Sequence, residues 1–248
     1  MSSIHRNTVG GLGNMAAEAI AENVGTFPIW QGIILVAAWL GGLVLLSEVL
    51  YRRELASAEV GRKIVHIGTG NVVLFAWLLG IPAWMGIVAA VLAGAVALIS
   101  YRVSILPSVN GVGRKSLGTF FYAISVGVAI AIFWGVDEPY FAALGIGVMA
   151  WGDGLAGLVG QRWGRHQYEI LGGRKSWEGS AVMGLVSGLV TAGVLWLAFG
   201  SFPQLWLIAG GVAIAAAALE TISFVGIDNL TVPLGSAGLA YGLVHWLI

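Results

Sequence analysis

The chain has 248 residues, of which 58% are hydrophobic and 10% are charged, and its formal net charge is zero. A soluble domain of this size must cover its surface with polar groups, so the composition excludes an ordinary soluble protein and indicates an integral membrane protein. The balanced charge gives no support for nucleic-acid binding, and the absence of cysteine excludes disulfides, thiolate catalysis and cysteine-based zinc sites. Because backbone groups in a bilayer must hydrogen-bond to one another, the sequence predicts an all-α polytopic fold.

The chain begins with a segment of mixed composition, and we expect residues 1–29 to form an N-terminal extramembrane segment. This segment does not have the short apolar core and cleavage site of a signal peptide. Residues 14–23 are compatible with a short surface helix. We expect residues 30–248 to form a single transmembrane domain.

Apolar stretches of about 20 residues, the length that spans a bilayer, follow one another along this domain. Pro82 divides the second stretch from the third, because a helix usually ends before a proline. The sequence therefore predicts a bundle of about eight transmembrane helices. They are residues 30–51, 64–81, 83–101, 117–135, 140–161, 177–199, 204–225 and 231–248.

Basic residues are distributed unevenly between the loops. Eleven of the twelve lysines and arginines follow the first, third and fifth spans, and the loops after the second, fourth and sixth spans contain none. By the positive-inside rule, the basic loops are cytoplasmic and both chain ends lie outside. The eleven residues are Arg52, Arg53, Arg62, Lys63, Arg102, Arg114, Lys115, Arg162, Arg165, Arg174 and Lys175.

Ionisable residues inside apolar spans are costly, so each one is a candidate functional residue. In the topology given above, all but one of them lie toward the cytoplasmic side. The exception is His245, which we interpret as an interfacial residue without a function. The others are Glu48, His66, Asp153, Glu178, Glu220 and, in the loop after the seventh span, Asp228.

An acidic residue between two glycines marks the fifth span, where Asp153 separates Gly152 from Gly154. The glycines allow a phosphate–metal group to approach the backbone, and Mg²⁺ binds one or two carboxylates together with phosphate oxygens and water. The segment is therefore a candidate magnesium site. A structural role stays open, because a cation such as Arg62 would also neutralise the carboxylate.

A second candidate segment lies where the sixth span begins. Arg174 and Lys175 come directly before Ser176, a residue type that caps helix N-termini. The free N–H groups and the dipole of a helix start favour an anion, and Lys175 adds a mobile positive charge. Gly179 and Ser180 keep the first turn narrow. The sequence predicts a phosphate site here that is not a P-loop, because the upstream glycine and strand of that motif are absent.

Structural alternatives stay open for single residues of this set. Glu178 in a first helical turn stabilises the helix without any catalysis. His66 shares a helix face with Arg62 and Lys63, so it can serve pairing alone. Glu48 is also compatible with a structural role. The set is nevertheless informative, because independent polar residues would not all lie at one side of the membrane.

Four motifs, in this order along the chain, resemble those of the membrane CTP-dependent polyprenol kinases. This family includes the dolichol and phytol kinases and is related to the phosphatidate cytidylyltransferases. The resemblance covers about residues 60–235 and, with the stretch 116–122, is most similar to the phytol kinases of photosynthetic organisms. The motifs are Arg62-Lys-Ile-Val-His66, Gly152-Asp-Gly-Leu-Ala, Lys175-Ser-Trp-Glu-Gly-Ser180 and Glu220 with Asp228-Asn-Leu-Thr-Val-Pro233.

The resemblance implies that residues 30–248 form a kinase domain that moves a phosphoryl group from CTP to an isoprenoid alcohol, with Mg²⁺. It implies metal binding by Asp153 and Asp228, with Glu220 as a further ligand. His66 or Glu178 would orient or deprotonate the alcohol, and Lys175 would act on the phosphate. The expected nucleotide- and substrate-binding residues are Arg62, Lys63, Gly152, Gly154, Arg174, Lys175, Ser176, Gly179, Ser180 and Asn229.

The expected partners are CTP, a prenyl alcohol that enters from the bilayer, and membrane lipids, with no nucleic acid. The expected location is a plasma or thylakoid-type membrane with the site facing the cytoplasm, and the resemblance implies a role in tocopherol biosynthesis. Two alternatives remain. One is cytidylyl transfer to a lipid phosphate, although Asp153 has no second acid nearby. The other is a transporter, which would place polar residues near the midplane between inverted repeats.

Overall fold

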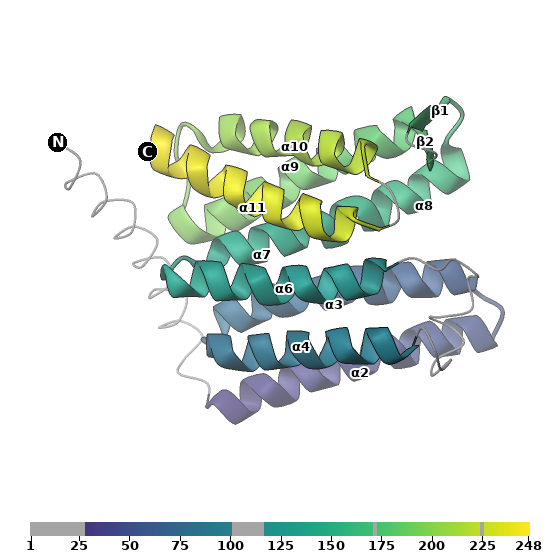
Figure 1. Cartoon of the computed structure of the whole chain (residues 1–248), viewed down its shortest axis with the longest axis horizontal. Coiled ribbons are helices and arrows are strands. Elements are labelled where there is room, and N and C mark those ends of the chain that lie inside the picture. Colours follow the sequence, from purple (N-terminus) through teal and green to yellow (C-terminus); the bar gives the residue numbers. More distant parts are fainter. Residues whose placement is uncertain (1–27, 101–116, 171–172, 224–225) are drawn as a thin grey trace.

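The computed structural model describes residues 28–100, 117–170, 173–223 and 226–248, which form a bundle of roughly parallel and antiparallel helices (Figure 1). The surface helix expected over residues 14–23 lies outside the described residues. The same is true of Arg102, Arg114 and Lys115.

The N-terminal half of the described chain consists of four long helices. They are α2 (Ile29–Arg52), α3 (Ala58–Leu78), α4 (Ala83–Ser100) and α6 (Gly118–Gly135). The C-terminal half begins with one continuous helical run that changes its winding in the middle, and a short hairpin and three further helices follow. These elements are α7 (Pro139–Gly147), the π-helix η1 (Val148–Asp153), α8 (Gly154–Trp163), β1 (Gln167–Ile170), β2 (Gly173–Ser176), α9 (Trp177–Phe199), α10 (Leu205–Thr221) and α11 (Asp228–Leu247).

Each of the eight spans expected from the sequence coincides with a helix. Within the described residues, five helices are long and apolar enough to cross a membrane: α2, α4, α6, α9 and the run from α7 to α8. Helix α10 is apolar but has only 17 residues. The helical membrane fold is thus confirmed, whereas eight crossings stay a prediction for α3, α10 and α11.

Helix α3 begins earlier than the apolar pattern suggests. Ser57 caps it by accepting a hydrogen bond from the Val60 N–H at 3.4 Å, so the helix starts at Ala58. Arg62 and Lys63 therefore lie in the first turns of α3, whereas the sequence analysis placed them in a loop. The directions of their side chains are therefore set by the rotation of α3 about its own axis.

Helix α7 occupies the middle of the bundle, between α3 and α6 on one side and α9 and α11 on the other (Figure 1). Every residue from Tyr140 to Ile146 is buried, and the packing against α11 is close. A Cβ on Gly145 would overlap the carbonyl oxygen of Pro233 in α11, so only glycine allows these helices to approach this far. The helical run that leads to Asp153 is therefore held on all sides.

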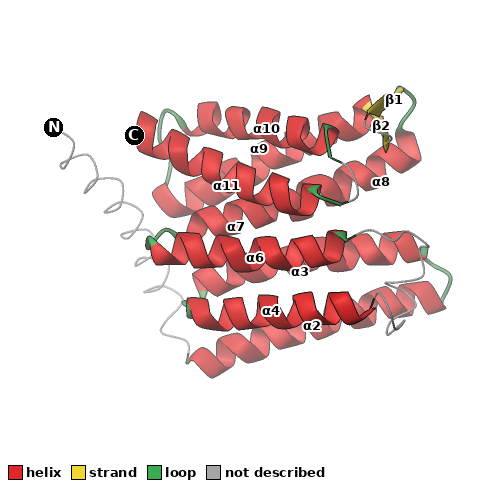
Figure 2. Cartoon of the chain, in the orientation of Figure 1, coloured by secondary structure: helices red, strands yellow, loops and turns green. Residues whose placement is uncertain are grey.

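A small antiparallel hairpin adds strands to the helical fold (Figure 2). β1 pairs with β2 so that Gln167 lies opposite Ser176 and Ile170 lies opposite Gly173. The all-α fold class is confirmed, and the hairpin is a short local addition that the sequence analysis did not predict. The strands have only four residues each and carry charged side chains, so they do not produce the alternating apolar pattern by which strands are recognised.

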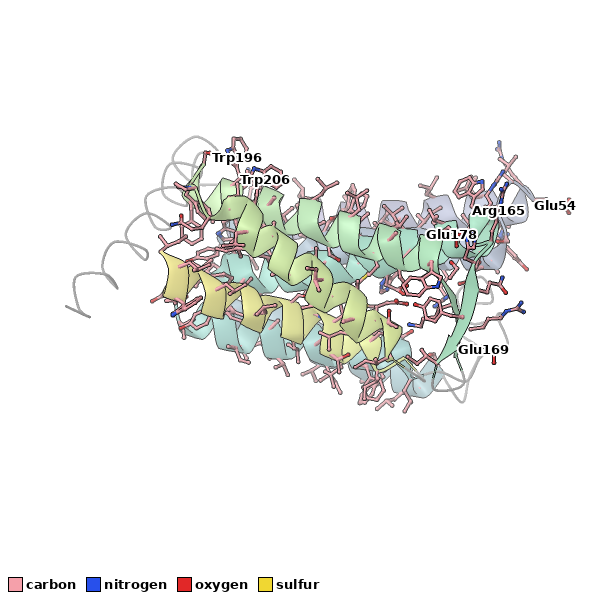
Figure 3. The ribbon with its side chains drawn as sticks, turned by 90° about the horizontal axis from the view of Figure 1, so that it is seen from above. Glu54, Arg165, Glu169, Glu178, Trp196 and Trp206 are labelled. Atoms are coloured by element: carbon pink, nitrogen blue, oxygen red, sulfur yellow. The ribbon has the colours of Figure 1, made fainter. Side chains whose placement is uncertain are left out.

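The two ends of the bundle differ in their polar residues. Figure 3 shows Arg165 and Glu178 at one end and Trp196 and Trp206 at the other. The hairpin lies at the first of these ends, together with Glu169. Polar chemistry is concentrated where α8, β2 and α9 meet.

Candidate functional site

A buried ion pair joins α3 to the π-helix. The Lys63 Nζ lies 2.6 Å from Asp153 Oδ2 and also donates to the main-chain oxygen of Asp153 at 3.1 Å. The Lys63 side chain is only 7% exposed and that of Asp153 is 21% exposed. The sequence analysis named Arg62 as an example of a cation that could neutralise Asp153, and the structure places the neighbouring Lys63 there.

Glycines around Asp153 let three helices meet at this pair. A Cβ on Gly154 would overlap Ile67 of α3, and a Cβ on Gly152 would lie 2.7 Å from the Met183 sulfur of α9. On α8, a Cβ on Gly157 would lie 2.9 Å from Lys63 Nζ. Single π-helical turns often occur at functional sites, and this one ends at the acidic residue. Gly152 and Gly154 thus serve helix packing, whatever their predicted role toward a substrate.

His66 lies beneath the ion pair. Its Nε2 is 3.7 Å from Asp153 Oδ2, beyond hydrogen-bond distance, and has no hydrogen-bond partner among the described residues. Its ring stacks at a tilt on Tyr122 of α6, with 4.7 Å between the ring centroids. Tyr122 was not singled out as a site residue by sequence reasoning, although it ends the stretch 116–122 that carries part of the family resemblance. His66 therefore has a nitrogen that is buried and available.

A second ion pair connects β2 to α10. The Lys175 Nζ lies 2.6 Å from Glu220 Oε1 and also donates to the main-chain oxygen of Glu220. Both side chains are mostly buried. The other carboxylate oxygen, Oε2 of Glu220, is buried without a hydrogen-bond partner in the part of the chain that the structure describes. This pair repeats the chemistry of Lys63 and Asp153 on different elements.

Asp228 links the two ion pairs. It opens α11, where its N–H donates to the Ser223 hydroxyl at 2.8 Å, and Asn229 Nδ2 donates to its Oδ1 at 3.1 Å. Its charge interacts with those of Asp153, Lys175 and Lys63. Three acidic residues and two lysines from five elements of the fold therefore share one electrostatic environment.

The start of α9 is capped as the sequence predicts. The Ser176 hydroxyl accepts a hydrogen bond from the Gly179 N–H at 3.1 Å, and Ser176 is buried. A Cβ on Gly179 would lie 3.1 Å from the Ala156 oxygen, so this glycine lets α8 and α9 touch. The start of α9 thus lies directly beside α8 and next to the hairpin.

Two predicted site residues form local contacts of their own. Glu178 accepts hydrogen bonds from the main-chain N–H of His166 and lies 2.8 Å from His166 Nδ1. Arg62 pairs with Glu59 one turn earlier at 2.6 Å. These contacts hold the hairpin and the start of α3.

Arg174 lies on β2 directly opposite Glu169 of β1 and is exposed. Opposite charges at such positions stabilise a strand pair. Glu48, for which a structural role was left open, pairs with Arg52 at 2.6 Å on α2. Arg174 and Glu48 therefore lie outside the buried set of charged residues.

A cluster of three hydroxyls was missed by sequence reasoning. The Tyr168 hydroxyl of β1 lies 2.6 Å from Ser180 Oγ of α9 and 3.3 Å from Thr221 Oγ1 of α10. Thr221 follows Glu220 directly, so the cluster borders the second ion pair. Ser180 was predicted from its motif, whereas nothing in the local sequence identifies Tyr168 or Thr221.

Known proteins with similar sequences share one description. The chain is 55% identical over 227 residues to the Phytol kinase of Synechocystis sp., a match that covers 91% of this chain and 97% of the relative. It is 30% identical over 239 residues to the Probable phytol kinase 2, chloroplastic, of Oryza sativa subsp. japonica, which covers 89% and 76% respectively. The chain belongs to the phytol kinase family.

A third relative is less similar to this chain in sequence but matches it over a similar length. Phytol kinase 1, chloroplastic, of Arabidopsis thaliana is 26% identical over 249 residues, which covers 90% of this chain and 80% of the relative. No family model matches the chain, and no solved structure matches it.

The acidic residues of the candidate site do not form a metal-binding cluster among the described residues. Across the described residues, no three His, Asp or Glu side chains are close enough together to hold a metal ion. Asp153 and Glu220 each contact a lysine instead. Their acidic charges nevertheless interact with each other and with that of Asp228. The predicted metal ligands therefore share one region without forming a metal-binding cluster among the described residues.

The opposite end of the bundle contains one buried acid. Glu138 lies between α6 and α7, where its Oε1 accepts the Tyr140 hydroxyl at 3.0 Å and lies 3.3 Å from His245 Nε2. Burial raises the pKa of the Glu138 carboxyl above its ordinary value, although the charge of His245 acts in the opposite direction. His245, predicted to have no function, thus has a partner that ties α11 to the start of α7.

Proposed function

We propose that this protein is a membrane lipid kinase that transfers the γ-phosphoryl group of CTP to the primary hydroxyl of phytol or a similar prenyl alcohol. The observation that carries the proposal is the pair of lysine–carboxylate contacts at one end of an apolar bundle, Lys63 with Asp153 and Lys175 with Glu220. The phytol kinases of Synechocystis and rice support the acceptor class. In the reaction, the alcohol oxygen forms a bond to the γ-phosphorus, the bond from that phosphorus to the β-phosphate oxygen breaks, and the alcohol proton passes to a base.

The two lysines are proposed to hold the phosphates of the nucleotide. Lys63 and Lys175 each carry a positive charge in a site with little exposure to water. Phosphoryl transfer depends mainly on positioning and on neutralising negative charge, which is what two buried ammonium groups supply. On binding, the phosphate oxygens would replace part of the contact that each lysine makes with its carboxylate.

Magnesium is proposed to be bound by Asp153 and Asp228, with Glu220 as a further ligand. Mg²⁺ is usually bound by one or two carboxylates together with phosphate oxygens and water, so a complete protein cage is not required. The buried Glu220 Oε2 has no donor among the described residues and is able to accept such a contact. When bound, the ion supplies neutralisation of the phosphate charge.

His66 is the better placed of the two candidates for orienting or deprotonating the alcohol. Its Nε2 is buried beside Asp153 and makes no hydrogen bond within the described residues. Glu178, the other candidate, contacts His166. A neutral imidazole nitrogen accepts a proton from a hydroxyl, and the nearby carboxylate stabilises the resulting cation.

The polar end of the bundle is proposed to face the cytoplasm. The basic residues collected after the odd-numbered spans support this orientation through the positive-inside rule. The alcohol would then enter sideways from the bilayer, with its hydroxyl at the level of the headgroups and its chain among the lipids. Such a route accounts for a site at the membrane edge.

A labelled assay tests the proposal. Purified protein in detergent receives Mg²⁺, γ-labelled CTP and a panel of prenyl alcohols, and both the lipid and the nucleotide products are identified. A kinase produces a labelled lipid phosphate and CDP. Release of pyrophosphate would indicate cytidylyl transfer, and the absence of any product with every alcohol would leave the lipid-kinase proposal without support.

A further inference from the structure

An apolar groove runs between two helices next to the polar end. It lies between α9 and α10, which are side by side in Figure 1, and is an open groove with a volume of about 500 Å³. Its floor consists of small residues, among them Gly184, Gly188 and Ala213, and its rims include Leu185 and Ile214. Both rim side chains are exposed on the outer surface of the bundle, so the groove opens sideways to the surrounding lipid.

The groove ends at the hydroxyl cluster. Ser180, Gly184 and Gly188 follow one another at intervals of four residues on α9, so they lie along one stripe. On α10, Ala213, Ala217 and Thr221 form a matching stripe in the opposite direction. A Cβ on Gly184 would lie within 3.8 Å of Ala217 and Ala213, which confirms that the two stripes face each other. Each stripe therefore finishes in a hydroxyl at the same end.

We infer that this groove binds the hydrocarbon chain of the acceptor alcohol, and that Ser180, Tyr168 and Thr221 mark the end of the groove from which its hydroxyl group extends toward the buried ion pairs. The inference rests on the proposed function and names the place of the substrate within it. The three side-chain hydroxyls are close to one another, and hydroxyls both donate and accept hydrogen bonds. Thr221 is adjacent to Glu220 in the chain, so this end of the groove lies beside the Lys175 ion pair.

The groove has the length and the lack of charge that suit a single neutral hydrocarbon chain. All of the described residues that line it are uncharged, and Ser180 is the residue with a side-chain hydroxyl among them. From Ser180 to Leu189 the wall of α9 extends for about 14 Å, at about 1.5 Å per residue. This is close to half of the roughly 30 Å hydrocarbon thickness, so the groove holds a chain within one leaflet. A neutral alcohol satisfies such a site, whereas a phospholipid would bring a charged phosphate to the hydroxyls.

Substitutions that fill the groove test the inference. A Cβ on Gly184 meets only ordinary contacts, at 3.7 Å and 3.8 Å, and Gly210 on the opposite wall has open space around its Cβ. Gly210→Leu therefore adds a side chain to the groove from a position with open space at its Cβ, and Gly184→Leu adds one from a position whose Cβ has only van der Waals contacts. Gly193→Leu is the matched control, because Gly193 is exposed on α9 with nothing within 4 Å of its Cβ and does not line the groove.

The groove variants should weaken the use of a long-chain alcohol more than that of a short-chain alcohol. Either groove variant should raise the KM for phytol about tenfold, which corresponds to the loss of roughly two buried methylene contacts. The KM for dimethylallyl alcohol and that for CTP should stay within about twofold of wild type, and Gly193→Leu should match wild type throughout. An unchanged KM for phytol in both groove variants, or an equal loss with the long and the short alcohol, would overturn the inference.

A binding readout separates this inference from the proposed function. A phytol analogue with a diazirine in its chain is irradiated with wild-type protein, and labelled peptides are identified. Label in α9 and α10 that is displaced by phytol, but not by phospholipid, supports the groove even if no phosphate is transferred. Label elsewhere, or displacement by phospholipid just as well, would overturn the inference and leave the kinase assay unaffected.

Discussion

Lys63 Nζ lies 2.6 Å from Asp153 Oδ2, although the two residues are 90 positions apart in the chain. Neither side chain has much contact with water. Breaking a buried ion pair by removing one partner typically costs about 3–5 kcal/mol, because the other charge is left uncompensated. The pair is therefore both a structural tie between α3 and η1 and the central element of the proposed site.

Replacement of Asp153 by asparagine tests its role in turnover. Asp153→Asn keeps the shape and one oxygen acceptor but removes the charge that is proposed to bind Mg²⁺. We expect a folded, monodisperse protein whose activity falls by about a hundredfold or more, the scale seen when one electrostatic contact is removed from an active site. Size-exclusion profiles and initial rates with CTP and phytol measure the two effects. A stable variant with a near-normal rate would show that this acid is not part of the catalytic site.

The double variant provides the control for folding. Lys63→Met alone leaves the buried Asp153 carboxylate without its cation, so the thermal unfolding temperature should fall. Lys63→Met combined with Asp153→Asn removes both charges, and the temperature should recover in part. Activity should remain low in both proteins. If the double variant regained activity together with stability, the pair would be a structural contact alone.

A small substitution should displace Lys63 without removing any charge. A Cβ on Gly157 would lie 2.9 Å from Lys63 Nζ and 3.0 Å from its Cε, and the flexible end of the lysine must move away. We expect Gly157→Ala to lower kcat several-fold with only a small change in unfolding temperature. Gly41→Ala is the control, because nothing lies within 4 Å of that Cβ. Equal rates for the two variants would argue against a precise position for Lys63.

Lys175 should affect the use of the nucleotide more than that of the alcohol. Its ammonium group is buried against Glu220, whereas Arg53 is exposed at the end of α2. Lys175→Ala should raise the KM for CTP by about tenfold or more, since hydrogen bonds to charged groups are worth about 1.5–3 kcal/mol. Arg53→Ala should leave that KM unchanged. Initial rates at varied CTP concentrations measure this KM. A wild-type KM for CTP in Lys175→Ala would mean that Lys175 contributes to membrane topology and does not bind the nucleotide.

The buried Glu138 predicts a pH dependence of stability at the other end of the bundle. Because its folded pKa is raised above the ordinary value of 4.5, its contribution is fully present below that pH and is lost as the pH rises through the folded pKa. Glu138→Gln removes this titration and keeps an acceptor for Tyr140. The unfolding temperature of wild type relative to Glu138→Gln should therefore decrease from about pH 4 to about pH 7. A difference that stayed constant over this range would contradict the burial of a titrating carboxyl.

Hydropathy alone located the helices of this fold. The span 177–199 matches α9 (Trp177–Phe199), and Ser176 caps it as expected. The start of α3 was placed too late because the apolar count begins at residue 64, whereas the capping signal of Ser57 begins the helix at Ala58. Short charged strands and a π-helical turn leave no periodic signature, so the β1–β2 hairpin and η1 were not foreseen.

The site was predictable in its residue types but not in its pairings. Acidic residues in apolar spans singled out Asp153 and Glu220, and basic residues beside the spans singled out Lys63 and Lys175. The structure joins these four residues in two ion pairs. Which of two adjacent basic residues meets Asp153 depends on the rotation of α3 relative to η1, and that is a property of tertiary packing. Tyr168 was missed for the same reason, because its partner hydroxyls come from two other helices.

The most direct test follows two labels in a single reaction. CTP that carries distinguishable labels on its α- and γ-phosphoryl groups is incubated with the purified protein, Mg²⁺ and phytol, and the lipid and aqueous phases are separated. The proposed lipid kinase places the γ label in the lipid phase and leaves the α label in CDP. Transfer of the α label to the lipid phase would contradict the proposed lipid kinase. Retention of both labels in the aqueous phase with folded, monodisperse protein would contradict it as well.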